Sequence, residues 1–301
     1  MAAGSLFLTQ FNWGAFINAL VLGLSLASIW LIAALGLTII YGSAGVINMA
    51  HGEFIMLGAY SAYTLQNSFG LPFLLCIPAS FFIVGAIGLF FERILIRYLY
   101  KRPLDTMLAT FGLSLMLVQG VRLVFGSSPK YVNVPEFVSS SIEIGVVNIA
   151  VVRILVFVIT IAVCVGLWFL FFRSRFGIQV RAVTQDKEMA ASFGVNSGRV
   201  YMMTFALGAG LAGLAGALLS AMNTVLPTMG ATYLVPSFLM VVVGGGTLAG
   251  SVAAGAGTGE LRSIFAYFTN DTFAQFVLFV LIVVFLRIRP QGLFAPSAKR
   301  R

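Results

Sequence analysis

Eight long runs of apolar residues divide this 301-residue chain, and most are as long as the segment of about 20 residues that crosses a lipid bilayer. They cover residues 15–41, 46–68, 71–91, 105–124, 151–172, 200–223, 233–268 and 272–288. Only 9% of the residues are charged, whereas a soluble domain carries roughly 25%. The sequence therefore excludes a water-soluble globule and predicts an all-α membrane protein. We expect a polytopic helical bundle of about eight spans, with residues 1–301 forming a single transmembrane domain.

The positive charges are gathered in short segments. No Lys or Arg precedes Arg93, and 14 of the 18 fall within 92–103, 173–199 and 287–301. Cytoplasmic loops carry such an excess, so we expect these segments and the C-terminus in the cytoplasm, and the loop 125–150 and the N-terminus in the periplasm. The same clustering argues against a nucleic-acid-binding face. The first fifteen residues have no positive charge and so lack the n-region of a cleavable signal peptide.

Glycines interrupt the apolar pattern in two places. Residues 244–246 are all glycine and split the run 233–268 into two pieces, which predicts a broken or re-entrant helix that protein or a cavity must cover. Glycines also recur between residues 42 and 52. Ala-His-Gly-Glu, ending at Glu53, is echoed by Gly-Thr-Gly-Glu, ending at Glu260, and the echo hints at the internal duplication common in transporters.

Three polar side chains, Asn48, His51 and Glu53, accompany the first break at or near membrane depth. His51 is the only histidine, and residues two apart on a helix point about 200° apart, so His51 and Glu53 do not form a metal site or a catalytic pair on one face. Two interpretations remain. The side chains bond backbone groups freed at the break, or they line or gate a polar pathway, the usual role of ionisable groups in membranes. Asn223 and Gly245 are further pathway or gate candidates, although Asn223 is also placed to cap a helix.

The basic segment 173–199 contains a short helical pattern. Thr184 as N-cap, Asp186 and Glu188 in the first turns and Gly194 as a left-handed stop predict a helix over 185–193. Such a helix is too short to be stable alone in water, so it needs a surface. Its apolar and small residues are Met189, Ala190, Ala191 and Phe193. They cover less apolar area than a helix lying on lipid normally would, which favours docking into another protein.

Three further patterns bear on fold and class. Gly208, Ala212 and Gly216 have the small-xxx-small spacing of closely packed membrane helices. Cys76 and Cys164 lie inside apolar runs, where packing is a commoner use than a disulfide. The sequence has no Gly-x-x-x-x-Gly-Lys-Ser/Thr loop, so we expect no ATP hydrolysis of the P-loop kind by this chain.

Several motifs together resemble the inner-membrane permeases of bacterial ATP-binding-cassette (ABC) importers for branched-chain amino acids and urea. They are Asn-Met-Ala-His-Gly-Glu within 45–60, the loop 181–196, Val-Val-Gly-Gly-Gly-Thr within 242–255, and Pro-Gln-Gly-Leu-Phe within 289–294. The motifs occur in the family's order along most of the chain. The residues of the first and last motifs are slightly closer to those of the urea branch. The resemblance therefore implies import of urea or short amides, with branched-chain amino acids as the alternative.

The resemblance also implies partners and roles. Two permease subunits would form the pathway, cytosolic ATPases holding ATP and Mg would drive it, and a periplasmic binding protein would deliver the solute. The helix 185–193 would be the coupling helix set into the ATPase, and the binding protein would touch 125–150 and 224–232. The residues expected to couple the chain to the ATPase are Arg181, Asp186, Glu188, Ala190, Ala191 and Gly194. The chain itself is expected to hold no cofactor and no metal and to be no enzyme.

Two other classes of protein fit the sequence less well than an importer subunit. An ion-coupled secondary transporter requires paired charges at mid-span. The sequence has almost none there, since Glu53 and Glu260 are the only carboxylate candidates. A membrane enzyme is disfavoured because the chain has a single histidine.

Overall fold

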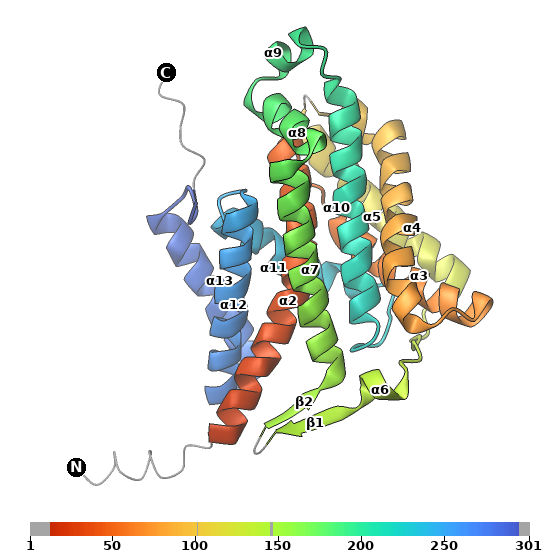
Figure 1. Ribbon diagram of the computed structural model, residues 1–301, viewed down its shortest axis with the longest axis vertical. Coiled ribbons are helices and arrows are strands. Elements are labelled where there is room, and N and C mark those ends of the chain that lie inside the picture. The colour runs from red at the N-terminus through yellow and green to blue at the C-terminus, as the bar shows by residue number, and fades with distance from the viewer. Residues whose placement is uncertain (1–12, 101, 145–146, 295–301) are drawn as a thin grey trace.

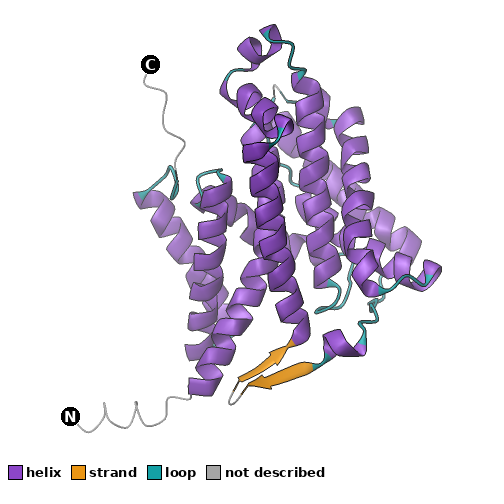
Figure 2. Cartoon of the chain, in the orientation of Figure 1, coloured by secondary structure: helices purple, strands orange, loops and turns teal. Residues whose placement is uncertain are grey.

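The apolar runs fold into long helices in the computed structural model, which describes residues 13–100, 102–144 and 147–294 (Figures 1 and 2). The long helices are α2 (Trp13–Ala44), α3 (His51–Phe69), α4 (Phe73–Ile94), α5 (Pro103–Phe125), α7 (Val151–Arg173), α10 (Ser197–Leu219), α11 (Met229–Val243), α12 (Leu248–Phe268) and α13 (Asp271–Ile288). The shorter elements are η1 (Ile96–Tyr98), α6 (Glu136–Ser139), β1 (Ser141–Ile144), β2 (Val147–Ala150), α8 (Arg175–Gln185) and α9 (Lys187–Ser192).

The predicted helical membrane bundle is confirmed. Within the described residues, α2, α4, α5, α7, α10 and α13 are long and apolar enough to cross a membrane, judged by length and composition. The helices α3 and α12 fall short on hydropathy, since α3 starts with polar residues and α12 carries Glu260 and Arg262. The helix α11 has 15 residues and is about 22 Å long, shorter than the hydrocarbon core of about 30 Å. The run 233–268 is therefore broken between Val243 and Leu248, where the glycines predicted it.

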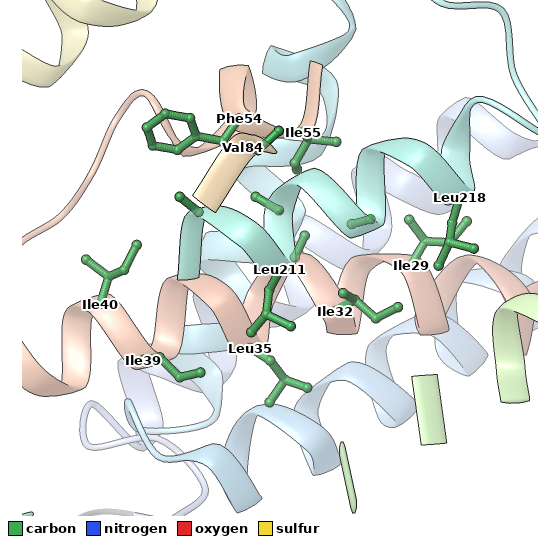
Figure 3. Close-up of a cluster of buried hydrophobic side chains, with 14 of the residues drawn as sticks. Ile29, Ile32, Leu35, Ile39, Ile40, Phe54, Ile55, Val84, Leu211 and Leu218 are labelled. Carbon is green, nitrogen blue, oxygen red and sulfur yellow. The ribbon is translucent and has the colours of Figure 1, made fainter. Parts of the chain in front are cut away.

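The core lies where α2 and α10 meet α3 and α4. Ile29, Ile32, Leu35, Ile39 and Ile40 of α2 pack with Phe54 and Ile55 of α3, Val84 of α4, and Leu211 and Leu218 of α10 (Figure 3). The predicted small-residue packing on α10 is also found: a Cβ on Gly208 would lie 2.5 Å from the carbonyl oxygen of Gly36, and one on Gly216 would collide with the carbonyl of Ile55. By contrast, α5 and α13 keep mostly exposed apolar surfaces, as lipid-facing helices do.

The molecule has two distinct ends (Figure 1). One end, here the α9 end, carries α8, α9, η1 and the last turn of α13; the other, the hairpin end, carries α6 and the antiparallel pair β1–β2, in which Ser141 pairs with Ala150. The described residues of the loop 125–150 thus include a short helix and two paired strands, and the backbone of Lys130 pairs with that of Val225 in the α10–α11 loop. Of the expected cytoplasmic charges, Lys101, Lys299, Arg300 and Arg301 lie outside the described residues.

Candidate functional site

Two helix N-termini meet inside the bundle. The helix α3 begins at His51 and α11 at Met229, and a Cβ on Gly230 would lie 2.5 Å from the carbonyl oxygen of Gly52. The imidazole of His51 bonds the carbonyl of Ala33, eleven residues before α2 ends at Ala44, or about 16 Å along its axis. The junction of α3 and α11 therefore lies within the protein and not at its α9 end.

The three predicted polar residues gather at this junction. Asn48, His51 and Glu53 are each at most 4% exposed. The amide oxygen of Asn48 accepts a hydrogen bond from the backbone N–H of Ala50 at 3.0 Å, Nε2 of His51 donates to the Ala33 carbonyl at 2.9 Å, and Oε1 of Glu53 accepts from the hydroxyl of Ser114 at 3.1 Å. The Asn48 and His51 bonds go to backbone, and the Glu53 bond joins α3 to α5.

Each of the three side chains keeps one polar atom without a partner. Among the described residues, Nδ2 of Asn48, Nδ1 of His51 and Oε2 of Glu53 are buried and make no hydrogen bond. Since Nε2 of His51 donates, Nδ1 of the neutral ring is an acceptor, so the cluster offers one donor and two acceptors. Buried polar atoms without partners are rare in folded proteins. Their gathering at one junction makes it the candidate site for a polar guest.

The backbone at the junction complements the carboxylate. Oε2 of Glu53 would lie 2.7 Å from a Cβ on Gly230, so Glu53 faces the first turn of α11. The N-terminus of a helix carries a positive partial charge, which favours a carboxylate there. Sequence reasoning missed both Ser114 and Gly230, because neither belongs to a local pattern and only the tertiary fold brings them to Glu53. In the described part of the chain, no group of three His, Cys, Asp or Glu side chains is placed to hold a metal ion.

The other two pathway candidates lie elsewhere. Asn223 is exposed in the α10–α11 loop, where its amide donates to the hydroxyl of Tyr233 at 3.0 Å. Gly245 lies at the far end of α11 with φ +73°, in a turn closed by a hydrogen bond from the N–H of Leu293 to the carbonyl of Val243 at 2.7 Å. The Gly-Gly-Gly and Pro-Gln-Gly-Leu-Phe motifs therefore contact each other at this end of α11, and we call this contact the joint.

This joint also contacts the first glycine break. A Cβ on Gly42 would lie 3.4 Å from the carbonyl oxygen of Gly246. The two glycine-broken zones of the sequence thus meet at one end of α11, while the other end of α11 meets the start of α3.

The predicted coupling segment forms two helices and not one. Thr184 is not an N-cap, because α8 runs through it and its hydroxyl donates to the carbonyl of Val180 at 2.8 Å. Asp186 caps α9 instead, accepting from the N–H groups of Glu188 and Met189 at 3.0 Å each. Gly194 has φ +79°, so the predicted left-handed stop is present.

The tip of this segment is apolar and uncovered. Met189 is 57% and Phe193 is 81% exposed, and Ala191 is exposed beside them. Ala190 is instead buried in the main core cluster. Arg181 is not part of the tip, since its guanidinium donates to the carbonyl of Phe171 and lies 5.6 Å from the ring centroid of Phe172. Arg181 thus fixes α8 to the end of α7.

Comparisons with known proteins cover nearly the whole chain. Residues 19–286 match the family described as "Branched-chain amino acid transport system / permease component". The chain is 32% identical over 292 residues to the "High-affinity branched-chain amino acid transport system permease protein BraD" of Pseudomonas aeruginosa, covering 92% of this chain and 95% of BraD. No solved structure matches.

Two related permeases of Salmonella typhimurium also match. LivH is 28% identical over 293 residues, covering 92% of this chain and 95% of LivH. LivM is 25% identical over 298 residues, covering 89% of this chain and 68% of LivM. Both are named as permease proteins of a high-affinity branched-chain amino acid transport system.

Proposed function

The chain belongs to the family of permease components of branched-chain amino acid transport systems, and from this we propose that it is one membrane subunit of an ABC importer for branched-chain amino acids in the bacterial inner membrane. The observation that carries the proposal is the end-to-end match to BraD, which covers the site and the coupling segment alike. The sequence motifs favoured urea slightly. The comparisons favour the alternative, because BraD, LivH and LivM are all named as permeases for branched-chain amino acids.

A second permease subunit is part of this proposal. One organism carries both LivH and LivM, and this chain is similar to each, which supports an importer built from two related permeases. In the described residues α5 has an exposed apolar surface and packs only lightly on the rest of the bundle. A second subunit facing α5 would complete the wall beside Ser114 and Glu53.

The tip of α9 is proposed to dock into a cytosolic ATPase that holds ATP and Mg. Its exposed Met189 and Phe193 offer apolar contacts, and Glu188 and Gly194 flank them. Closure of the ATPases on ATP would move α9, and α10 would carry the movement inward because the N–H of Val195 bonds the Ala190 carbonyl at 3.0 Å just before α10 begins. Such rigid-body movement of helices around a fixed site is a common form of alternating access.

The solute is proposed to enter at the hairpin end and pass the α3–α11 junction. The loops 125–150 and 224–232, expected to meet the binding protein, lie side by side through the backbone pairing of Lys130 with Val225. At the junction, the free acceptor of Glu53 suits an ammonium group, and the free N–H of Asn48 suits a carboxylate. An amino acid carries both groups, whereas urea carries neither charge.

Uptake in a strain that lacks its own branched-chain amino acid importers tests the function. The strain would express this chain with the permease, ATPase and binding-protein genes beside its own gene. Labelled leucine should accumulate in an ATP-dependent manner, and excess unlabelled urea should not compete. If urea accumulates and leucine does not, urea is the substrate and the proposed substrate class is wrong. Uptake by this chain alone, driven by an ion gradient, would show a secondary transporter and overturn the importer.

A further inference from the structure

A basic cup opens at the α9 end between η1 and the start of α10. It is a cavity of about 550 Å³ with a mainly polar lining, and four cationic side chains border it: Arg93, Arg97, Lys187 and Arg199. The ion pairs present among the described residues are Arg102–Asp105 and Arg262–Asp271, so none of the four is paired with a carboxylate there.

The single acidic residue of the cup, Glu92, interacts electrostatically with Arg97 and Arg93, and one carboxylate against four cations leaves an excess of positive charge. Glu92 is buried beneath them and accepts a hydrogen bond from the hydroxyl of Tyr100 at 2.9 Å. Burial, together with the nearby Glu92 carboxylate, raises the pKa of Tyr100 well above its usual range, so the phenol keeps the proton that it donates. The ring of Tyr201 contacts that of Tyr100 in a tilted arrangement with ring centroids 4.9 Å apart, and the ammonium group of Lys187 lies 5.2 Å from the centroid of the Tyr201 ring. The cup thus joins excess positive charge to aromatic walls.

Farther along α4 and α10, two apolar pockets that share lining residues form one groove. Its first part, of about 470 Å³, lies between α4, α7 and α10, and its second part, of about 330 Å³, follows between the same helices. On α10 the lining passes from Arg199 through Met203 and Leu207 to Leu211 and Leu214, at spacings of three or four residues that keep to one face. From Arg199 to Leu214 the helix rises about 22 Å, enough for one leaflet of a bilayer whose core is about 30 Å thick.

The facing helix carries the matching stripe. On α4 the lining passes from Arg93 through Leu89, Ala86 and Phe82 to Pro78, again at spacings of three or four. Ala86 and Ala206 leave the middle of the groove wide, since neither fills the space between the helices.

We propose that the cup and groove bind one anionic phospholipid, with its phosphate among Arg93, Arg97, Lys187 and Arg199 and an acyl chain between α4, α7 and α10. Arginine and lysine recognise phosphate oxygens, and an anionic headgroup gains about 1 kcal/mol per nearby cation. Tyrosines at the level of the headgroups are typical of the membrane interface. A free phosphate would occupy the cup alone, and an apolar helix of another subunit would leave the cations without a partner, so a lipid satisfies both parts. The site is separate from the α3–α11 junction and does not depend on which solute the importer carries.

Lipid binding to the purified full-length chain tests the proposal. The chain in detergent is titrated with phosphatidylglycerol or phosphatidylcholine, and the bound fraction is measured by native mass spectrometry. Phosphatidylglycerol should bind at least tenfold more tightly. The double variant R97Q/R199Q should weaken phosphatidylglycerol about 30-fold, from two cations of about 1 kcal/mol each, and should weaken phosphatidylcholine less, because its choline offsets the charge of its phosphate. The matched control R122Q/R153Q removes two arginines far from the cup, one in the last turn of α5 and one in the first turn of α7. It should change the affinity for neither lipid.

The groove is tested separately from the cup. The variant A86F/A206F fills the groove with side chains and should weaken phosphatidylglycerol without changing the weak binding of inorganic phosphate in the cup. If A86F/A206F binds phosphatidylglycerol normally, the site is for a free anion and the lipid proposal is wrong. Equal affinity for the two lipids, or equal loss in R122Q/R153Q, also overturns it. The proposal is also wrong if a photo-crosslinker at position 206 of the assembled importer reacts with the second permease or the ATPase and not with lipid.

Discussion

Single side chains at the α3–α11 junction combine burial with unused hydrogen-bonding capacity. Asn48, His51 and Glu53 lie within six residues of sequence, and each has one bond within the protein and one free polar atom. A role in holding the helix break accounts for the bonds that are made. The free atoms are left over, and a buried acceptor or donor without a partner costs about 1–3 kcal/mol. A polar solute passing the junction would supply the missing partners.

Replacing Glu53 by Gln tests this role. Gln keeps the size of the side chain and can still accept from Ser114, but it removes the negative charge offered to an ammonium group. Uptake of labelled leucine should fall about tenfold, the loss expected for one hydrogen bond to a charged group worth about 1.5 kcal/mol. Surface expression should stay normal.

Glu260 provides the matched control for that experiment. It is a second carboxylate in the interior of a long apolar run, and its Oε2 also lacks a partner among the described residues, but it lies on α12. E260Q should transport at close to the normal rate. If E53Q transports normally, Glu53 has a structural role only.

The contact between Gly52 and Gly230 leads to a prediction about stability. A Cβ at residue 52 would collide with the backbone of Gly230, so Gly52→Ala must push α3 and α11 apart. We expect a loss of about 1–3 kcal/mol, measured as a lower midpoint of thermal unfolding in detergent. Gly112→Ala on α5 is the control, because a Cβ there meets nothing within 4 Å and alanine favours a helix over glycine by up to about 1 kcal/mol. Equal loss in both variants would mean that α3 and α11 do not pack as described.

At the scale of elements, patterns along the chain predicted most of the helices. The eight apolar runs became helices because backbone groups at membrane depth must form their hydrogen bonds within the segment, and the break at residues 244–246 followed from three glycines in a row. The helix α8 was not predicted. It is amphipathic, with Val180 and Val183 buried and Ser174 as its cap, but it is too polar to stand out among apolar spans. The sequence also could not predict that Ser114 and Gly230 lie beside Glu53, because this depends on contacts between helices distant in sequence.

The cap of α9 can be tested by mutation. Asp186→Ala removes the acceptor of two backbone N–H groups, which costs about 1 kcal/mol and frays a helix of only six residues. ATP hydrolysis by the assembled importer, stimulated by the binding protein and solute, should fall about fivefold. Asp186→Asn should keep most of the activity, because Asn is an equally good N-cap.

Thr184→Ala separates this cap from the one that the sequence suggested. The hydroxyl of Thr184 bonds only within α8, so T184A should hydrolyse ATP at the normal rate. Stimulated hydrolysis that is lost in T184A and kept in D186A would place the start of the coupling helix at residue 184 after all.

On the scale of the whole molecule, the two ends have different charges and different proposed partners. The α9 end carries the basic cup and the apolar tip of α9, and the hairpin end carries the paired loops around Lys130 and Val225. Between them α10 runs as one helix of 23 residues, packed on α2, α3 and α4. In the proposed importer, a push on α9 would therefore reach the faces that enclose the α3–α11 junction. This arrangement serves an importer only if the α9 end faces the ATP of the cytoplasm.

The orientation can be measured in cells. The distribution of positive charges predicts that the α9 end faces the cytoplasm. In a background where Cys76 and Cys164 are replaced by alanine, Ser128→Cys at the hairpin end and Ser192→Cys on α9 each carry one reactive thiol. A maleimide that does not cross membranes should label position 128 in intact spheroplasts and position 192 only after lysis. The reverse pattern would put α9 in the periplasm, where no ATPase can reach it, and would remove the importer mechanism while leaving the fold intact.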